Sequence, residues 1–189
     1  MGKRLVIGMS GASGAPLTVE LLRQLRKNHP EVETHLIVTR GAELTLAQET
    51  DVSLDELKGL ASVCHENGNI GASVASGSFK TMGMIVVPCS MKTVAGVVSG
   101  YSDNLLLRAA DVCLKERRKL VLCAREAPLS TVHLRNLYEA SQLGAVILPP
   151  MLTYYNHPNS LEDCTRHTVN RLLSQFDLDE ESYQWEGMA

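Results

Sequence analysis

RLVIGMSGASGAP, at residues 4–16, is the stretch that decides the fold of this chain. Its apolar run at residues 5–7 predicts a buried strand, which ends in a glycine-rich turn at residues 8–14. Pro16 then opens a predicted helix, because proline fits the first helical position, where its missing N–H would have no intrahelical partner. A strand, a glycine-rich turn and a helix start together point backbone N–H groups at an anion. We therefore expect either a phosphate-bearing ligand on residues 11–14 or a tight turn that binds nothing.

The rest of the chain continues to alternate between strands and helices. Further strands are expected at residues 33–39, 84–87, 120–123 and 146–148. Helices are expected at residues 16–28, 41–49, 53–60, 94–100, 104–115, 130–143 and 160–176. The weakly patterned residues 63–80 are expected to form a long loop. This alternation predicts an α/β fold in which a parallel sheet lies between helix layers. No linker composition interrupts the chain, so we expect one domain over residues 1–189.

Composition and charge exclude several classes of function. The chain carries 18 basic and 21 acidic side chains, a net charge of −3, whereas a nucleic-acid surface needs a basic face. No apolar stretch approaches the roughly 20 residues that cross a bilayer, and residues 1–16 do not resemble a secretion signal. The five cysteines have no CxxC spacing, which argues against a disulfide framework or a zinc site. We therefore expect a cytoplasmic protein without a metal, a membrane or a nucleic-acid partner.

The loops that follow the predicted strands should gather at one rim. Right-handed crossovers place these loops at a single edge of a parallel sheet, where ligands of such folds bind. The rim would hold small hydroxyl groups, glycines, and the charges of Lys92 and Arg125, all of which suit a phosphate. The glycines at 8, 11 and 14 do not form GxGxxG, and no acidic residue that would bind ribose follows the second strand. The pattern therefore favours a mononucleotide such as FMN over a nicotinamide dinucleotide.

Other features of the sequence bear on catalysis. Residues 11–15, GASGA, lack the final glycine of a nucleophile elbow, and no histidine ends a late strand, so a hydrolase is disfavoured. Arg108 and Lys115 are seven residues apart on one helix and could bind a second anion. Glu49 and Glu126 are the candidate acid–base carboxylates. Glu49 ends a helix and is expected at the surface, whereas Glu126 lies between a strand end and Pro128.

Several motifs together resemble the UbiX flavin prenyltransferases, a family that includes the B subunits of phenolic acid decarboxylase systems. The resemblance covers nearly the whole chain. Its motifs are SGASGAP (10–16), QETD (48–51), SGSF (76–79), CSMKT (89–93), RAADVCLKERR (108–118), REAPLS (125–130), YYNHP (154–158) and VNRLL (169–173).

The resemblance implies a Rossmann-like three-layer fold that assembles as a homododecamer. It implies that the chain binds reduced FMN and dimethylallyl monophosphate, without a metal. The five-carbon unit would be attached to N5 and C6 of the flavin, and the prenylated FMN would be used by a UbiD-type decarboxylase. Two alternatives stay open. One is an FMN-binding accessory subunit of an aromatic acid decarboxylase. The other is a flavin-dependent cysteine decarboxylase, although the Pro-Ala-Ser-Ala-Asn-Thr signature of that class is absent at residues 88–93.

The resemblance also carries residue roles to positions of this chain. The FMN-binding positions would be Gly11, Ala12, Ser13, Thr39, Ser90, Met91, Lys92, Thr93 and Arg125. The prenyl phosphate would be held by Ser76, Arg108, Lys115, Tyr155 and Arg171. Catalysis would involve Ser13, Glu49 and Glu126. Thr39 replaces the serine that is common in the family, and the aromatic residue that some members have before Ser76 is missing. Tyr155 or Trp185 is expected to shelter the prenyl group beside the flavin ring.

Overall fold

A single parallel sheet forms the centre of the molecule. The computed structural model describes residues 3–178 and residue 187. In this part of the chain the strands lie in the order β3-β2-β1-β4-β5-β6, and every recorded pair is parallel. Their bounds are β1 Lys3–Met9, β2 Val32–Val38, β3 Val63–Glu66, β4 Gly83–Cys89, β5 Lys119–Ala124 and β6 Val146–Ile147. The order of the strands reverses between β1 and β4, which is the switch point where doubly wound folds bind ligands.

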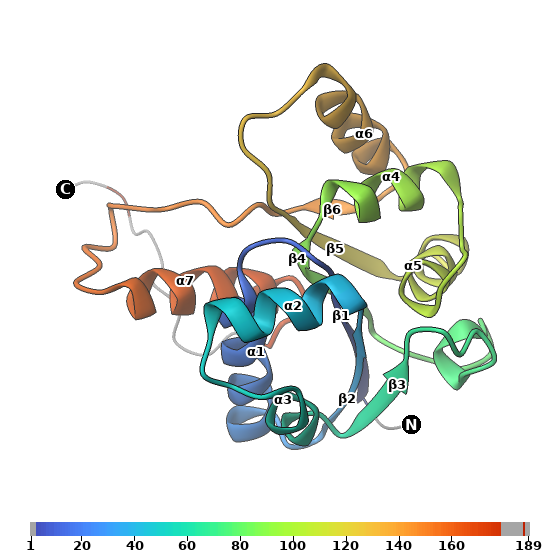
Figure 1. The fold of residues 1–189 in the computed structure, drawn as a ribbon, viewed down its shortest axis with the longest axis horizontal. Coiled ribbons are helices and arrows are strands. Elements are labelled where there is room, and N and C mark those ends of the chain that lie inside the picture. Colours follow the sequence, from blue (N-terminus) through green and yellow to red (C-terminus); the bar gives the residue numbers. More distant parts are fainter. Residues whose placement is uncertain (1–2, 179–186, 188–189) are drawn as a thin grey trace.

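Helices cover both faces of this sheet (Figure 1). They are α1 Ala15–Asn28, α2 Arg40–Glu49, α3 Leu54–Leu60, α4 Met91–Ser99, α5 Leu105–Lys115, α6 Thr131–Gln142 and α7 Leu161–Ser174, with the short 3₁₀-helix η1 at Ser73–Ala75. One core cluster packs α1 and α7 against one face, and a second cluster packs α4 and α5 against the other. The predicted three-layer Rossmann-like α/β fold is therefore confirmed.

The apolar runs of the central strands produce this arrangement. Side chains alternate between the two faces of a strand, so Leu5 and Ile7 of β1 face α1 and α7 while Val6 faces the other layer. All three side chains are at most 2% exposed. Burial of each such side chain stabilises the fold by about 1.5–3 kcal/mol. Both faces are covered, which is why the sequence of β1 reads as a continuous apolar run rather than an alternating one.

The segment at residues 63–80 differs from the expected loop. It contains β3, which pairs with β2 at the edge of the sheet, and η1, which packs against α5. The residues of β3 alternate between half-buried and exposed, so this short edge strand has no apolar run to reveal it. Two helix bounds also differ from the expected ones by more than one residue. The helix that we expected at residue 94 begins at Met91, and the helix that we expected to end near residue 176 ends at Ser174.

Side-chain caps explain where several helices begin. The predicted capping box before α3 is confirmed: Ser53 accepts from the N–H of Glu56, and Glu56 accepts from the N–H of Ser53. Ser90 caps α4 in the same way by accepting from Thr93 N–H, which draws the start of α4 back to Met91. No helix of the described residues is long and apolar enough to cross a membrane.

Candidate active site

Ser10 joins the two loops that border the switch point of the sheet. Its side chain is 1% exposed and lies between the end of β1 and the end of β4. Its hydroxyl donates to the carbonyl of Pro88 at 3.1 Å and accepts from the N–H of Ser90 at 2.8 Å. These two bonds hold the glycine-rich turn beside the start of α4, so both loops belong to one site.

The glycine-rich turn also touches the start of α2. A Cβ at Gly11 would lie 2.9 Å from the Cα of Gly41, so only glycine allows the two backbones to approach this closely. Thr39 lies between the end of β1 and the start of α2. Its N–H donates to the carbonyl of Met9 at 3.0 Å, and its hydroxyl caps α2. Within the turn, the N–H of Ala12 donates to the carbonyl of Ser10. Gly11, Ala12 and Thr39 therefore share one side of the rim.

The carboxylate of Glu49 caps the first helix. Glu49 is the last residue of α2, and its Oε2 accepts from the N–H groups of Gly14 and Ala15, each at 2.8 Å. The backbone of Gly14 has a φ of 126°, a conformation that suits glycine and turns these N–H groups toward the carboxylate. The sequence left two alternatives open for residues 11–14, a phosphate-bearing ligand or a tight turn that binds nothing. At Gly14 the N–H group that a phosphate would need already donates to a carboxylate of the protein.

The surroundings of Glu49 keep its carboxyl group ionised. Burial is the largest single influence and would raise its pKa, but the hydrogen bonds from Gly14, Ala15 and Ser13 together with the charge of Arg125 outweigh it. The pKa of Glu49 is therefore below its ordinary value of 4.5. Glu49 is partly buried, whereas the sequence predicted that it lies at the surface. The Ser13 hydroxyl donates to its ionised carboxylate.

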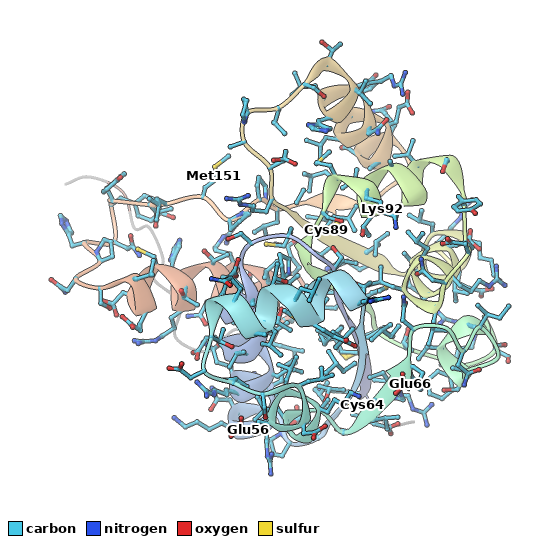
Figure 2. The ribbon with its side chains drawn as sticks, viewed as in Figure 1. Glu56, Cys64, Glu66, Cys89, Lys92 and Met151 are labelled. Carbon is cyan, nitrogen blue, oxygen red and sulfur yellow. The ribbon has the colours of Figure 1, made fainter. Side chains whose placement is uncertain are left out.

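A cavity of about 490 Å³ opens beside these groups. Ser13, Glu49 and Arg125 line it together, so three of the predicted site residues meet in one space. The opposite wall comes from α7 and from the segment at residues 150–152, whose apolar side chains include Met151 and Leu152. Figure 2 shows Cys89 at the end of β4, with Lys92 on one side of it and Met151 on the other. The cavity thus offers one polar wall and one apolar wall.

The start of α4 differs from that of α1. Ser90 satisfies the N–H of Thr93, and its hydroxyl also lies 3.1 Å from that of Thr93. The N–H groups of Met91 and Lys92 belong to the first helical turn, and neither donates a hydrogen bond to the described part of the chain. The exposed side chain of Lys92 adds a positive charge beside these N–H groups. Four of the predicted FMN-binding residues thus form an open anion site.

The second candidate carboxylate, Glu126, is exposed just beyond β5. Its Oε1 accepts from the N–H of Ala127 at 3.0 Å, and it does not line the cavity that contains Glu49. The preceding residue is fixed to the rim, because the N–H of Arg125 donates to the carbonyl of Cys89 at 3.0 Å. The two carboxylates therefore differ in their surroundings: Glu49 is part of a helix cap, and Glu126 faces solvent.

Three of the predicted phosphate-binding residues lie around η1. Nε of Arg108 donates to the carbonyl of Ala75 at 3.2 Å, which places this side chain against the residue before Ser76. The ammonium of Lys115 lies beside Gly77 and donates to Glu116 at 2.6 Å. The hydroxyl of Ser76 is exposed. Ser76, Arg108 and Lys115 therefore form one group, called here the α5 group.

The other two predicted phosphate-binding residues lie on and next to α7. The hydroxyl of Tyr155 is 3.2 Å from Nε2 of His167, and the two rings meet edge to face. Arg171 lies one turn further along the helix. Burial, and then the charge of Arg171, lower the pKa of His167, so its imidazole is neutral at pH 7. We call Tyr155, His167 and Arg171 the α7 group. From the sequence, His167 is expected to lie at the surface or to serve only in packing. Its spacing of four residues from Arg171 is the one sequence signal that the two side chains are neighbours on the helix.

The α5 group and the α7 group are not brought together within one chain. α5 packs on the second core cluster and α7 on the first, so the two helices lie on opposite faces of the sheet (Figure 1). One predicted contact cannot be placed, because Trp185 lies outside the described residues. A complete prenyl-phosphate site would therefore need residues from more than one copy of the chain.

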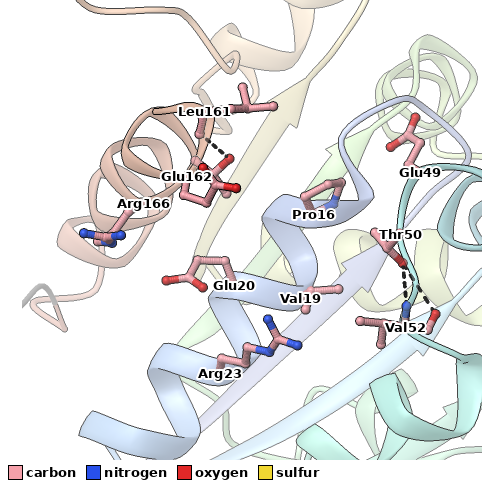
Figure 3. Close-up of a pocket in the computed structure, with 11 residues that line it drawn as sticks. Pro16, Val19, Glu20, Arg23, Glu49, Thr50, Val52, Leu161, Glu162 and Arg166 are labelled. Carbon is pink, nitrogen blue, oxygen red and sulfur yellow. Dashed lines mark hydrogen bonds between the residues drawn. The ribbon is translucent and has the colours of Figure 1, made fainter. Parts of the chain in front are cut away.

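A second pocket, of about 420 Å³, lies behind the helix cap. Figure 3 shows that its walls come from α1 and α7, with Glu49 and Thr50 closing one end. Two arginines, Arg23 and Arg166, line it together with three carboxylates, Glu20, Glu49 and Glu162, so its lining carries no excess of positive charge for a phosphate. This pocket contains none of the rim hydroxyls, and we assign the ligand site to the first cavity.

Cys164 lines the first cavity, but among the residues described the cysteines supply neither a disulfide nor a recognisable metal centre. None of the five cysteines, which all lie in the described part of the chain, forms a disulfide. Burial raises the pKa of Cys113 and of Cys123 to about 12, so both thiols stay protonated at neutral pH. Among residues 3–178 and 187, no three side chains of histidine, cysteine, aspartate or glutamate are arranged to hold a metal ion.

Comparisons with known proteins agree with this geometry. Residues 1–170 match the Flavoprotein family model. The flavin prenyltransferase UbiX of Escherichia coli strain K12 is 52% identical over 188 residues, which is 98% of this chain and 99% of that protein. A solved dodecameric FMN-dependent UbiX-like decarboxylase from Escherichia coli O157:H7 is 49% identical, with a TM-score of 0.95 and coverage of 97% of this chain and 100% of that one.

A further solved structure holds small molecules. It is a UbiX protein in complex with FMN and dimethylallyl pyrophosphate, 47% identical to this chain, with a TM-score of 0.96 and full coverage of both chains. The likeness extends over the whole length of these relatives, and their names agree with the motifs quoted above. The chain therefore belongs to the UbiX family of flavin prenyltransferases.

Proposed function

We propose that this chain transfers a dimethylallyl group from dimethylallyl monophosphate to N5 and C6 of reduced FMN. The observation that carries the proposal is the cavity in which Ser13, Glu49 and Arg125 meet beside the open start of α4. A relative in complex with FMN and dimethylallyl pyrophosphate supports the choice of FMN and of a dimethylallyl donor. The transfer would release phosphate and yield prenylated FMN.

The residues at the rim fit FMN. The phosphate would bind at the N–H groups of Met91 and Lys92, where the helix dipole and the lysine favour an anion. Gly11, Ala12, Thr39, Ser90 and Thr93 would surround the ribityl chain, and Arg125 would hold the polar edge of the ring system. Reduced FMN supplies the electron-rich atoms N5 and C6 that accept the prenyl group.

Two carboxylates would have separate tasks. Ser13 would orient the N5 end of the flavin, since its hydroxyl is held by the ionised Glu49. Glu126 is free of such a network and would move a proton during ring closure. The apolar wall formed by Met151 and Leu152 would exclude water, which would otherwise compete for the allylic group.

The prenyl phosphate would be held between copies of the chain. Arg108 and Lys115 of the α5 group, with Ser76, would meet Tyr155 and Arg171 of a partner's α7 group. The cations would stabilise the negative charge that develops on the departing phosphate. The segment before α7 supports this arrangement: Met151, Leu152, Tyr154 and Leu161 are each more than 60% exposed, and such an apolar patch favours a protein partner. A homododecamer, the assembly of one solved relative, would cover it.

The product would pass to a UbiD-type decarboxylase, the recipient that membership of the UbiX family implies. We further propose a cytoplasmic location and one domain over residues 1–189. Two other functions are tested by the same assay: an accessory subunit would bind FMN without converting it, and a cysteine decarboxylase would leave the flavin unchanged while decarboxylating a peptide cysteine.

The test is anaerobic incubation of the protein with reduced FMN and dimethylallyl monophosphate. Mass spectrometry of the extracted flavin should find a product that is heavier by one C5 unit, and phosphate should be released in equal amount. A parallel sample with dimethylallyl pyrophosphate measures the preference for one phosphate or two. Bound flavin that keeps its mass would contradict the proposal.

A further inference from the structure

Arg118 lies beneath the segment that carries Ser76. Its guanidinium donates from one terminal nitrogen to the carbonyl of Phe79 at 2.8 Å and from the other to the carbonyl of Gly77. The first nitrogen is also 3.4 Å from the hydroxyl of Thr81. The side chain is only 10% exposed. Arg118 therefore binds two backbone carbonyls and one threonine hydroxyl of a single short segment, about 40 residues away in sequence.

These contacts exclude Arg118 as a direct ligand of the prenyl phosphate. Both terminal nitrogens already donate to backbone carbonyls, and the burial of the side chain keeps solutes away. Its nearest opposite charge is Glu116, whose Oε2 is 3.9 Å from the guanidinium. The other oxygen of Glu116 accepts from Lys115, so a single carboxylate links the buried arginine to the lysine of the α5 group. The neighbouring Arg117 is exposed, so the two arginines have different surroundings.

The segment is also fixed on its remaining sides. Arg108 donates to the carbonyl of Ala75 at 3.2 Å, immediately before Ser76. Phe79, immediately after this stretch, lies under the guanidinium of Arg4 at 4.4 Å and against the edge of His35 at 5.2 Å. Ser76 is thus an exposed residue of a stretch that is anchored at both ends, and its hydroxyl lies 2.8 Å from that of the exposed Ser78. Without Arg118, its carbonyls at Gly77 and Phe79 would lose their side-chain donor.

The approach of Lys115 depends on the same stretch. A Cβ at Gly77 would lie 2.8 Å from the ammonium of Lys115 and closer still to the carboxylate of Glu116, so these side chains lie directly over the Gly77 backbone. A shift of Gly77 would therefore move Ser76 and Lys115 relative to each other. The side chain that sets the position of Gly77 is Arg118.

We propose that Arg118 is a positioning residue for the prenyl-phosphate site, which holds the backbone at residues 77–79 so that Ser76 and Lys115 face the same anion. The role of the anion rests on the proposed function. The contact itself does not, and its effect on the backbone can be measured without any substrate.

The guanidinium is needed for its shape as well as its charge. Its two terminal nitrogens donate to two different carbonyls, whereas a lysine carries all of its donors on one nitrogen. Arg118→Lys keeps the charge, but its single nitrogen cannot reproduce the fixed fork with which the guanidinium reaches both carbonyls. If Arg118 acted by charge alone, the lysine variant would behave like the wild type.

The experiment compares Arg118→Gln and Arg118→Lys with Arg117→Gln, which removes the same charge from the adjacent exposed residue. Hydrogen–deuterium exchange is followed in the peptide that covers residues 73–82, where the N–H of Ser76 and that of Phe79 make local turn bonds. In the full-length enzyme, the KM for dimethylallyl monophosphate and the Kd for FMN are then measured. Thermal unfolding of each variant reports on its overall stability.

We expect both Arg118 variants to exchange faster than the wild type in this peptide and to raise the KM for dimethylallyl monophosphate about tenfold, as the loss of a charged hydrogen bond implies. The Kd for FMN should stay within about twofold of the wild type, because the rim is not touched. Arg117→Gln should match the wild type in all three measurements.

Three results would overturn the proposal: unchanged exchange in both Arg118 variants, wild-type KM in Arg118→Lys, or loss of FMN binding together with substrate binding, which would make Arg118 a residue of general stability. If the wild type itself converts no flavin, the proposed function fails. Exchange in residues 73–82 and the affinity for inorganic phosphate then decide on Arg118 alone.

Discussion

Two helices, α1 and α4, begin on either side of the switch point. They differ in whether the N–H groups of the first turn already have an anionic acceptor. At the start of α1, the N–H groups of Gly14 and Ala15 donate to the carboxylate of Glu49. At the start of α4, Ser90 caps one N–H, while those of Met91 and Lys92 have no acceptor in the described part of the chain. The dipole of α1 is thus neutralised by the protein, and that of α4 is left for a ligand.

The difference teaches that a glycine-rich turn before a helix does not by itself make a phosphate site. The turn at residues 8–14 has the expected geometry, but a side chain 34 residues away fills the position that a phosphate would take. The same contact distinguishes the two carboxylates. Glu49 is held ionised in a helix cap, whereas Glu126 is exposed, which is why we propose Glu126 for proton transfer.

The largest effect should come from replacing Glu126, the carboxylate that does not cap a helix. Glu126→Gln should slow prenyl transfer by about 10²–10⁴-fold, because an amide cannot exchange the proton. FMN should still bind with nearly wild-type affinity, since Glu126 does not line the cavity. Single-turnover assays with flavin detected by mass separate the two quantities. Wild-type turnover in this variant would remove Glu126 from the mechanism.

Replacing Glu49, which caps α1, should lower the stability of the protein. Glu49→Gln should lower the free energy of unfolding by about 1–2 kcal/mol at pH 7, as the loss of a helix-capping acceptor does. The pKa of Glu49 is lowered by folding, so its contribution is present above the ordinary value of 4.5 and is lost as the pH falls through the folded value. Denaturant unfolding at several pH values measures this. If the variant and the wild type still differ in their free energy of unfolding at a pH below the folded pKa of Glu49, the capping role is contradicted.

Replacing Lys92 at the start of α4 should weaken the binding of FMN. Lys92→Met removes an exposed charge beside the start of α4, and it should raise the Kd for FMN by about three- to fivefold at low salt. The effect should shrink as the ionic strength rises, because salt screens exposed charges. Flavin fluorescence titrations at two salt concentrations provide the measurement. A loss of affinity that does not depend on salt would argue against an electrostatic role.

The smallest effect concerns His167 of α7, whose side chain contacts Tyr155 rather than the groups at the starts of α1 and α4. Folding lowers the pKa of His167, so the unfolded chain binds a proton more readily and stability falls as the pH drops through about 6.5. His167→Gln should make this fall shallower by less than about 1 kcal/mol. Unfolding curves from pH 8 to pH 5 test the difference, and identical slopes in both proteins would remove His167 from the effect.

The sequence predicted the parts of the molecule that depend on neighbouring residues. The apolar runs of β1, β4 and β5 and the capping box of Ser53 are local patterns, and the structure has each of them. β3 was missed because an edge strand with one half-exposed face has no apolar run. The ordered strands were enough to bring the rim residues to one edge.

The contacts that distinguish the two helix starts could not be predicted in this way. Glu49 meets Gly14, and Arg118 meets Gly77, over separations of 35 and 41 residues. Sequence motifs indicated that Glu49 belongs to the site, but not that it caps a helix, and they did not indicate that Arg118 is buried. Such pairings depend on how the layers pack, which a single sequence does not reveal.

The central claim, that α4 rather than α1 receives the phosphate of FMN, is tested by comparing FMN with riboflavin, which lacks the phosphate. Lys92→Pro removes one open N–H at a position where helices accept proline, and Lys92→Met controls for the lost charge. The preference for FMN over riboflavin should fall further in Lys92→Pro than in Lys92→Met and should persist in Glu49→Gln. A preference that survives in Lys92→Pro but collapses in Glu49→Gln would contradict the account.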